Sequence, residues 1–600
     1  MHRCNKSFTK MYTELKSYQI IIALLKKYEI KHLVLSAGSR NVPFVHSVEK
    51  DPYFKCYSVV DERSAGYFAL GLSQQLQEPV AISCTASTAS CNYYPPVAEA
   101  FYQGVPIVVL TSDRNPMMLG QWEDQMIDQV NMFDRHVKKS VNLPSEVNNH
   151  EDWLYCQRLV NEALLELNHH GTGPVHINIP MRSYNNTFTV KELPKVKKYE
   201  RFDVLTKSES WEQLAKELAN SRILVTVGQR SLYDSELNSL LTAFSKRTNA
   251  AICLDHMSNV ECENSFNGCV SLDSRYITGS KFKEMMPDVV ISFGGNVFGG
   301  VKEMLRRYEG HFSHWSIQED GRVVDMYKSL SYIFECPPSF FFKKILEYIT
   351  KEQSGSEYYK LLNSFTNSIE LPDTKFNNIY AIRRVVEAIP ENSTLHLSIN
   401  DSIRISNFFR LHSNIKTFAN IGTFGIDGSL STIIGQSNGT SELSFLVIGD
   451  LAFFYDMNAL RIKHVSNNVR VLMINNHGGE EFYYNKTWND EYSDLHTSAR
   501  HNTKAEGWVN ETPFLYLSAR DIETFEKNFE VFMSTSSERP IFFEVFTEMK
   551  TDAEDIYSFY EKSRPSDIQS ALIDKGKSIV KGLLGEERAK RIASNTIFKF

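Results

Sequence analysis

Residues 444–479 read SFLVIGDLAFFYDMNALRIKHVSNNVRVLMINNHGG. Two apolar runs, Phe445–Ile448 and Val469–Ile474, predict buried strands, and the stretch between them is long enough for a helix. A strand, a helix and a second strand in this order form a right-handed unit of a parallel sheet. The first strand is followed by Asp450 and the second by Asn476. These polar residues should therefore meet at one edge of the sheet, where open α/β folds bind their ligands.

This edge of the sheet predicts a metal and diphosphate site. The Asp450 carboxylate and the Asn476 amide oxygen are ligands of the kind that Mg²⁺ prefers, together with phosphate oxygens and water. Gly449 lets the backbone approach a diphosphate, and the start of the following helix favours an anion. The alternative is structural, with Asp450 capping a helix and Asn and Gly forming a turn. The complete pattern of a strand, Gly-Asp, a second strand and Asn-Asn is similar to the thiamine-diphosphate signature. This complete pattern is more specific than Gly-Asp or Asn-Asn alone.

The same alternation of strands and helices extends over nearly the whole chain and predicts an α/β protein with parallel sheets. Two polar stretches, Tyr184–Ser208 and Lys351–Asn377, interrupt the alternation. The interruptions divide the chain into three consecutive α/β domains, with predicted bounds 1–190, 205–350 and 375–555. The remaining residues, 556–600, form a basic tail that is predicted to be an amphipathic helix on the protein's own surface or a contact for a partner or membrane. The other predicted strands are His32–Ser36, Tyr57–Val60, Val80–Thr85, Pro106–Ser112, Val175–Ile179, Ile223–Val227, Ala251–Leu254, Val289–Phe293, Thr394–Ile399 and Pro540–Phe546.

Composition excludes several classes of protein. The chain of 600 residues is 42% hydrophobic, and its formal net charge of −7 gives no support for nucleic-acid binding. Nine cysteines form no CxxC pair, which indicates neither a zinc site nor a disulfide framework. The apolar run Ile20–Leu25 is too short for a signal peptide, and no stretch approaches the ~18 apolar residues of a transmembrane helix. A cytoplasmic location is predicted by elimination.

A second motif, VVDERSAG at residues 59–66, places Glu62 where a predicted strand gives way to a helix. Thiamine chemistry requires a carboxylic group against the pyrimidine ring nitrogen, where it shares a proton. Glu62 is the candidate for this catalytic, cofactor-contacting role. Standing alone, Asp-Glu-Arg would indicate only an exposed helix start stabilised by its acids.

Together these segments resemble the family of 2-succinyl-5-enolpyruvyl-6-hydroxy-3-cyclohexene-1-carboxylate synthases of menaquinone biosynthesis. The similarity is clearest over residues 30–145, which include SAGSRNVPF, DERSAGYFALGLS and QWEDQMIDQ, and over residues 418–482. The resemblance implies a pyrimidine-binding domain, a central domain and a diphosphate-binding domain, with thiamine diphosphate and Mg²⁺ as cofactors. It also implies a decarboxylating carboligase that uses 2-oxoglutarate and isochorismate, and a homodimer or homotetramer with shared active sites.

The resemblance also assigns roles around the cofactor. It implies that Glu62 acts on the cofactor held by Asp450 and Asn476 of the partner subunit. The backbone carbonyl of Gly478 would complete the metal ligands. Ile426 matches the apolar wedge that would bend the cofactor.

The substrate side matches the family less closely. Ser39, Arg40, Arg114 and Gln125 correspond to groups that bind carboxylates in the family. Asp124 stands where the family has Asn, Ile421 stands where it has Arg, and the expected Ser-Lys pair is missing near Gly294–Gly300. Lys302 and Arg404 are candidate replacements, with solvated side chains as the alternative. The Gly-rich stretch lacks the GxGxxG order of a dinucleotide site, so a tight turn is the better interpretation.

These departures leave two alternatives to the family reaction. One is an enzyme that decarboxylates or ligates a different 2-oxoacid. The other is a catalytically silent homologue that binds a partner through its tail. For the family reaction and for the alternative enzyme, the predicted partners are a 2-oxoacid and an acidic acceptor.

Overall fold

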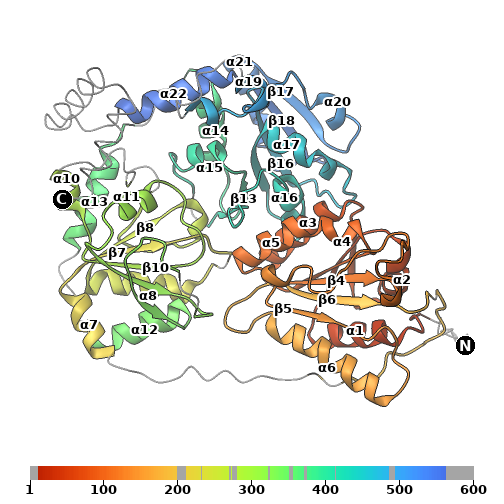
Figure 1. The fold of residues 1–600 in the computed structure, drawn as a ribbon. Coiled ribbons are helices and arrows are strands. Elements are labelled where there is room, and N and C mark those ends of the chain that lie inside the picture. The colour runs from red at the N-terminus through yellow and green to blue at the C-terminus, as the bar shows by residue number, and fades with distance from the viewer. Residues whose placement is uncertain are drawn as a thin grey trace, which may run out of the picture.

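The protein contains three six-stranded sheets whose strand pairs are all parallel. The computed structural model describes residues 11–562 except 185, 197, 199–210, 232, 269–271, 273–279, 322–323, 350–355, 371–374, 413 and 485–492. The sheets form three lobes, with the N-terminal one at the lower right, the central one at the lower left and the C-terminal one at the top (Figure 1). The predicted fold class is confirmed.

The N-terminal sheet has the strand order β2-β1-β3-β4-β6-β5. Its strands are β1 (His32–Leu35), β2 (Lys55–Ser58), β3 (Val80–Cys84), β4 (Ile107–Asp113), β5 (Lys139–Asn142) and β6 (Val175–Pro180). Its helices include α1 (Lys16–Lys27), α2 (Val42–Glu49), α3 (Glu62–Leu76), α4 (Thr88–Asn92), α5 (Tyr94–Gln103) and α6 (His150–Glu166).

The central sheet has the order β12-β11-β10-β7-β8-β9, the doubly wound arrangement in which strand order reverses between β7 and β10. Its strands are β7 (Arg222–Val227), β8 (Asn249–Leu254), β9 (Ser265–Asn267), β10 (Val289–Phe293), β11 (Ser313–Ile317) and β12 (Leu330–Phe334). Its helices include α7 (Trp211–Ala219), α8 (Ser235–Arg247), α10 (Ser280–Met285), α11 (Val301–Arg307) and α12 (Pro338–Tyr348).

The C-terminal sheet repeats the order of the N-terminal one, β14-β13-β15-β16-β18-β17. Its strands are β13 (Thr394–Leu397), β14 (Lys416–Ala419), β15 (Ser444–Gly449), β16 (Val469–Asn475), β17 (Leu515–Ala519) and β18 (Ile541–Phe546). Its helices include α13 (Glu357–Asn367), α14 (Asn378–Val386), α15 (Asp401–Ser406), α16 (Ser429–Ser437), α17 (Asp450–Asp456), α18 (Glu481–Tyr484), α19 (Ser493–His496), α20 (Glu506–Val509), α21 (Ile522–Phe532) and α22 (Met549–Lys562).

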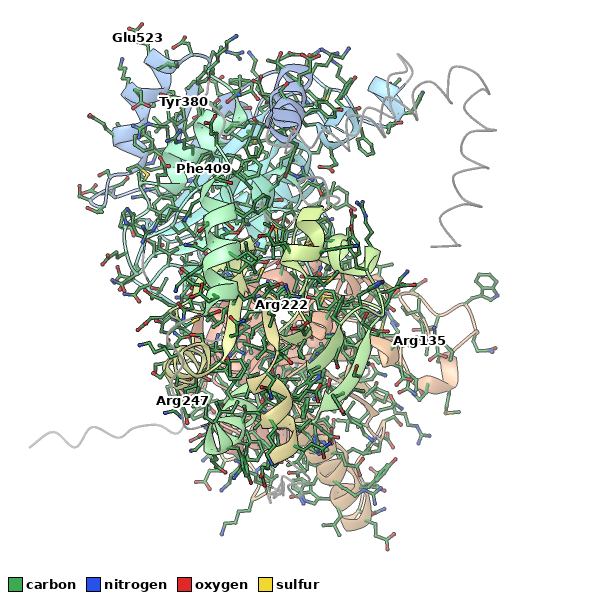
Figure 2. All side chains as sticks on the ribbon, turned by 90° about the vertical axis from the view of Figure 1, so that its left-hand side faces the viewer. Arg135, Arg222, Arg247, Tyr380, Phe409 and Glu523 are labelled. Carbon is green, nitrogen blue, oxygen red and sulfur yellow. The ribbon has the colours of Figure 1, made fainter. Side chains whose placement is uncertain are left out.

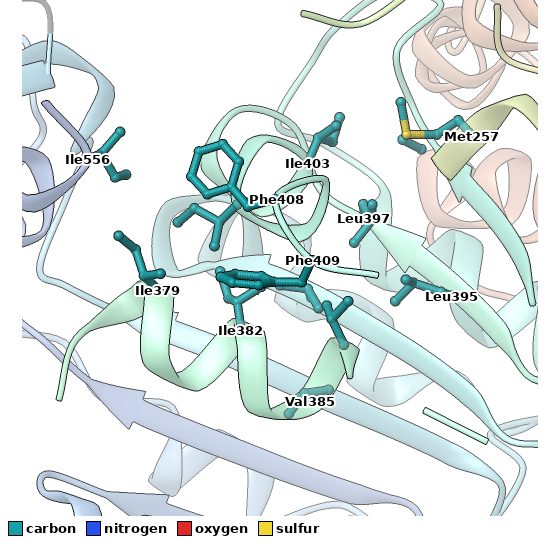
Figure 3. Packing of buried hydrophobic residues seen from close by; sticks show 14 of the residues in the cluster. Met257, Ile379, Ile382, Val385, Leu395, Leu397, Ile403, Phe408, Phe409 and Ile556 are labelled. Carbon is teal, nitrogen blue, oxygen red and sulfur yellow. The ribbon is translucent and has the colours of Figure 1, made fainter. Parts of the chain in front are cut away.

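Helix α22 crosses the predicted start of the tail at residue 556. Ile556 is buried in the same core as Ile379 and Ile382 of α14 and Phe408 (Figure 3). This first turn of the predicted tail therefore belongs to the C-terminal core, and residues 563–600 lie outside the described part of the chain. Figure 2 shows Tyr380, Phe409 and Glu523 of the C-terminal lobe above Arg222 and Arg247 of the central lobe.

The structure also bears on the state of the cysteines and on the presence of membrane-spanning helices. The seven cysteines within the described ranges are all free thiols. Across those same ranges, none of the helices has the length and apolar character needed to cross a bilayer.

Helix α3 of the N-terminal lobe and α16 of the C-terminal lobe touch through glycines. A Cβ atom on Gly71 would lie 2.0 Å from the Thr432 carbonyl oxygen, and one on Gly435 would lie 2.1 Å from that of Phe68. Because both neighbours are backbone atoms, neither side can yield without moving a helix. The glycines therefore set the distance between the two lobes.

Gly435→Ala is expected to destabilise the protein by ~1–3 kcal/mol, because the new methyl group forces the two helices apart. The shift in the midpoint of urea unfolding measures this change. Gly507→Ala is the matched control, since a Cβ there meets nothing within 4 Å. Equal midpoints for the two variants would contradict this account of the interface.

Candidate functional site

Asp450 lies at the carboxyl edge of the C-terminal sheet, where β15 passes directly into α17. Its side chain is 2% exposed. The carboxylate accepts hydrogen bonds from the backbone N–H groups of Leu451 (2.6 Å) and Gly478 (3.0 Å). Since Gly478 follows β16, this contact brings the two halves of the sequence motif together at one edge.

Asn476 presents its amide oxygen at the same edge. Its Nδ2 donates to Glu480 Oε2 at 2.8 Å, and its Oδ1 accepts no hydrogen bond from any residue that the structure describes. Gly478 has φ +152°, and a Cβ there would lie 2.7 Å from the Ser498 carbonyl oxygen. The position therefore requires glycine. A buried carboxylate beside an unbonded amide oxygen is a donor set that suits Mg²⁺, so these residues fit the metal.

His501 adds a contact that reasoning from the sequence did not predict. Its Nδ1 accepts the backbone N–H of Thr503 at 3.1 Å, so in the neutral ring the proton is on Nε2. Nε2 lies 3.3 Å from Asp450 Oδ2. The imidazole is therefore a close neighbour of the Asp450 carboxylate, although its Nε2 makes no hydrogen bond with any residue that the structure describes.

The backbone is open at Gly449, next to this edge. A Cβ built on Gly449 meets nothing within 4 Å. Ile426 is 37% exposed, although the loop that carries it is tightly held. The buried Glu99 of α5 accepts the N–H groups of Gly422 (2.9 Å) and Thr423 (2.7 Å), and the two oxygen atoms of its carboxylate are thus both used. An apolar side chain on a fixed loop is suited to act as a wedge.

Glu62 is the first residue of α3 and lies at the carboxyl edge of the N-terminal sheet. Asp61 caps the helix by accepting the N–H groups of Arg63 and Ser64. The Glu62 carboxylate accepts from Asn92 Nδ2 at 3.3 Å. Within the described ranges, no hydrogen bond joins Glu62 to Asp450, Asn476 or Gly478 of its own chain.

The predicted substrate residues Ser39, Arg40, Arg114 and Gln125 lie together in the N-terminal lobe. The Arg40 guanidinium lies 4.8 Å from the centre of the Tyr184 ring, and the Tyr184 hydroxyl donates to the Ser39 carbonyl at 2.6 Å. Arg114 pairs with Glu123 at 2.5 Å and donates to Gln125 at 3.4 Å. Burial and the charge of Arg114 lower the pKa of Arg40. Two neighbouring cations of this kind favour an anionic ligand.

The candidate replacement cations are already engaged. Arg404 forms ion pairs with Asp401 and with Glu481, the latter at 2.8 Å. Lys302 Nζ donates to Asn296 Oδ1 at 2.7 Å. Ile421 is 1% exposed, so its side chain is buried in the core instead of lining an open pocket.

Sequence comparison defines the class of this protein. Residues 15–132 match the family described as "Thiamine pyrophosphate enzyme, N-terminal TPP binding domain". The chain is thus a thiamine-diphosphate-dependent enzyme.

Full-length relatives define its family. The chain is 37% identical over 560 residues to a 2-succinyl-5-enolpyruvyl-6-hydroxy-3-cyclohexene-1-carboxylate synthase of Bacteroides thetaiotaomicron, which covers 92% of this chain and 99% of the relative. A protein of the same name from Phocaeicola vulgatus is 35% identical, and the match covers 92% of this chain and 99% of the relative. Another from Flavobacterium johnsoniae is 31% identical, and the match covers 90% of this chain and 97% of the relative. The chain belongs to this synthase family of decarboxylating carboligases, which use thiamine diphosphate and typically Mg²⁺.

Three residues of the site were missed by reasoning from sequence. Glu99, Glu480 and His501 contact the predicted residues or their loops from other segments. Glu480 stands four positions after Asn476, and this proximity was the one available signal. Glu99 and His501 act across long sequence separations and carry no motif.

Proposed function

We propose that this enzyme decarboxylates 2-oxoglutarate and adds the remaining four-carbon unit to isochorismate. The observation that carries the proposal is the meeting of Asp450, Asn476 and Gly478 at one sheet edge in a chain whose relatives carry the synthase name. Arg40 and Arg114 support an acidic acceptor, because both cations lie in one region of the N-terminal lobe. The partners of the protein are then a small 2-oxoacid and an acidic acceptor.

We propose the following roles for the cofactor residues. Asp450, Asn476 Oδ1 and the Gly478 carbonyl hold Mg²⁺, and the open space at Gly449 receives the diphosphate. Ile426 supports the cofactor as an apolar wedge. Thiamine diphosphate, when bound, supplies the nucleophilic carbon that allows a 2-oxoacid to lose CO₂. In this scheme residues 1–190 form the pyrimidine-binding domain, 205–350 the central domain and 375–555 the diphosphate-binding domain.

We also propose a cytoplasmic homodimer, or a dimer of dimers, in which Glu62 completes the active site of the partner. Large apolar side chains near the start of α3 support a second copy as the occupant of this surface. Val60 is 60% exposed and Tyr455 is 54% exposed. Both lie beside contacts made by residues 61–63, since Arg63 donates to the Tyr455 carbonyl at 2.9 Å. Free cysteines agree with a reducing compartment.

A second candidate function is the use of a different 2-oxoacid. It is favoured by the engagement of Arg404 with two carboxylates and of Lys302 with Asn296. The distal carboxylate of 2-oxoglutarate needs a cation when it is buried. If neither side chain is released, a less charged 2-oxoacid is the better donor.

Steady-state kinetics will separate these candidates. Under the proposed function, 2-oxoglutarate is consumed only when isochorismate is present. Its kcat/KM should exceed that of pyruvate roughly 10- to 100-fold, because a charge-assisted contact contributes ~1.5–3 kcal/mol. A higher kcat/KM for pyruvate or another monocarboxylic 2-oxoacid would replace the proposed donor with the second candidate.

A further inference from the structure

The loop that carries Ile426 belongs to the C-terminal lobe, but its first anchor lies in the N-terminal lobe. This wedge loop, residues 420–428, joins β14 to α16. Glu99 of α5 accepts the backbone N–H of Gly422 through Oε1 at 2.9 Å and that of Thr423 through Oε2 at 2.7 Å. It also accepts the Thr423 hydroxyl. The start of the wedge loop is therefore tied to a helix of another lobe.

A second anchor holds the far end of the wedge loop. The Tyr67 hydroxyl of α3, also in the N-terminal lobe, donates to Asp427 Oδ2 at 2.8 Å. Only residues 424–426 lie between the two anchors, and Phe424 and Ile426 are 39% and 37% exposed. A span this short has few conformations. The two anchors therefore determine where the Ile426 side chain projects.

The central lobe holds the approach to the same loop through its backbone carbonyls. Gln229 Nε2 donates to the Ala419 carbonyl at 2.5 Å, and Asn296 Nδ2 donates to the Ile421 carbonyl at 3.1 Å. All three lobes thus meet at the start of the wedge loop. Of these contacts, those of Glu99 are the closest in sequence to Ile426.

The chemistry at position 99 requires two acceptor atoms. Glu99 is 0% exposed, and the two backbone N–H groups that face its oxygen atoms can only donate. A carboxyl group can accept at both oxygens whether or not it is ionised, whereas a glutamine has one acceptor oxygen and would turn an N–H group toward a second N–H group. Burial raises the pKa of Glu99, and the hydrogen bonds from Thr423, Gln103 and Gly422 oppose this rise. The contrast with glutamine therefore holds in both protonation states.

We propose that Glu99 is a positioning residue that holds Ile426 in place beside the cofactor. The inference rests on the wedge role proposed for Ile426. Glu99 does not touch the cofactor in this scheme and acts only through the wedge loop. Each N-terminal lobe then serves two active sites, that of the partner through Glu62 and that of its own chain through Glu99.

Hydrogen exchange in the cofactor-free protein tests the anchor directly. In Glu99→Gln the peptide that contains Gly422 and Thr423 is expected to exchange about 10-fold faster, because one of the two N–H groups loses its acceptor. Exchange in β4 and β15 should stay as in the wild type. Unchanged exchange in the wedge loop would overturn the inference. Faster exchange throughout the core strands would show a merely structural role and would also overturn it.

Asp51→Asn is the matched control for this measurement. It changes another buried carboxyl group of the N-terminal lobe, which binds Tyr12 and Lys26 instead of the wedge loop. The melting temperature of this variant should fall, whereas exchange in the wedge loop should stay as in the wild type. Faster exchange of that loop in Asp51→Asn would show that any loss of stability loosens it, which would overturn the specific role of Glu99.

Calorimetric titration with thiamine diphosphate and Mg²⁺ connects the anchor to the cofactor. Glu99→Gln is expected to weaken cofactor binding roughly 3- to 10-fold, because binding must then order a looser loop. Ile426→Ala should also weaken binding. Since Glu99 is proposed to act through Ile426, adding Glu99→Gln to Ile426→Ala should cause no further loss. Additive losses in the double variant would overturn the inference.

The other outcomes separate this inference from the proposed function. Wild-type affinity in Glu99→Gln, together with weaker binding in Ile426→Ala, would overturn the inference and keep the proposed cofactor site. Failure of the wild type to bind thiamine diphosphate would instead remove the proposed function. If Glu99→Gln does not fold, Glu99→Asp replaces it, because the shorter acid cannot reach both N–H groups. Unchanged exchange of the wedge loop in Glu99→Asp would then overturn the inference.

Discussion

Asp450→Ala is expected to abolish Mg²⁺-dependent binding of thiamine diphosphate and to leave the fold intact. Asp450 supplies the only carboxylate in the proposed ligand set, and its side chain is buried at the start of α17. Removing one partner of a buried charge pair costs ~3–5 kcal/mol. Affinity for the metal and cofactor should therefore fall by roughly two to four orders of magnitude.

Calorimetry with thiamine diphosphate and Mg²⁺ measures this loss. Asp51→Ala is a matched control, because Asp51 is also a buried aspartate. It precedes β2 and so lies at the amino edge of the N-terminal sheet, whereas Asp450 follows β15 at the carboxyl edge of the C-terminal sheet. It accepts from Tyr12 at 2.6 Å and pairs with Lys26 at 2.7 Å. Its loss should lower stability without changing cofactor affinity. Unchanged affinity in Asp450→Ala would remove Asp450 from the metal site.

The fold was predictable where strands are buried on both faces. Strands such as β4 and β15 are continuous apolar runs, because helices cover both sides of a parallel sheet. The sequence did not predict β5, β9, β12, β14 or β17, which lie at sheet edges, and it also did not predict β11, which is an internal strand of the central sheet. Edge strands such as β5, with the sequence KSVN, are short and partly exposed, so no apolar pattern marks them.

The candidate site could be predicted only where the order of strands in a parallel sheet determines which residues lie close together. Residues that directly follow neighbouring parallel strands must lie close together, and this reasoning located Asp450 and Asn476. It could not show that Glu481 neutralises Arg404, or that His501 lies beside Asp450. Those contacts depend on how distant segments fold back on the sheet edge, and single residues at such separations leave no periodic signal.

Glu62→Gln is expected to bind thiamine diphosphate and lose most of its turnover. The amide keeps the size of the side chain and its contact with Asn92, but it cannot share a proton with the cofactor ring. General acid–base groups contribute roughly 10²- to 10⁴-fold, so kcat should fall within that range. Steady-state kinetics at saturating cofactor measures the change, and full activity would exclude Glu62 from the mechanism.

Mixing Glu62→Gln with Asp450→Ala tests whether the active sites are shared. If Glu62 acts on the partner's cofactor, a mixed dimer contains one site with both residues intact. Random exchange of subunits makes half of the dimers mixed, so about one quarter of wild-type activity should return from two inactive variants. If instead each chain completed its own site, every site in the mixture would lack one residue. Within this chain, Asp61 accepts a hydrogen bond from Asn458 Nδ2 of the C-terminal lobe at 2.6 Å, which fixes the start of α3 against its own chain. Glu62 is the next residue, so the start of α3 that carries it is held in place whichever outcome the mixing experiment has.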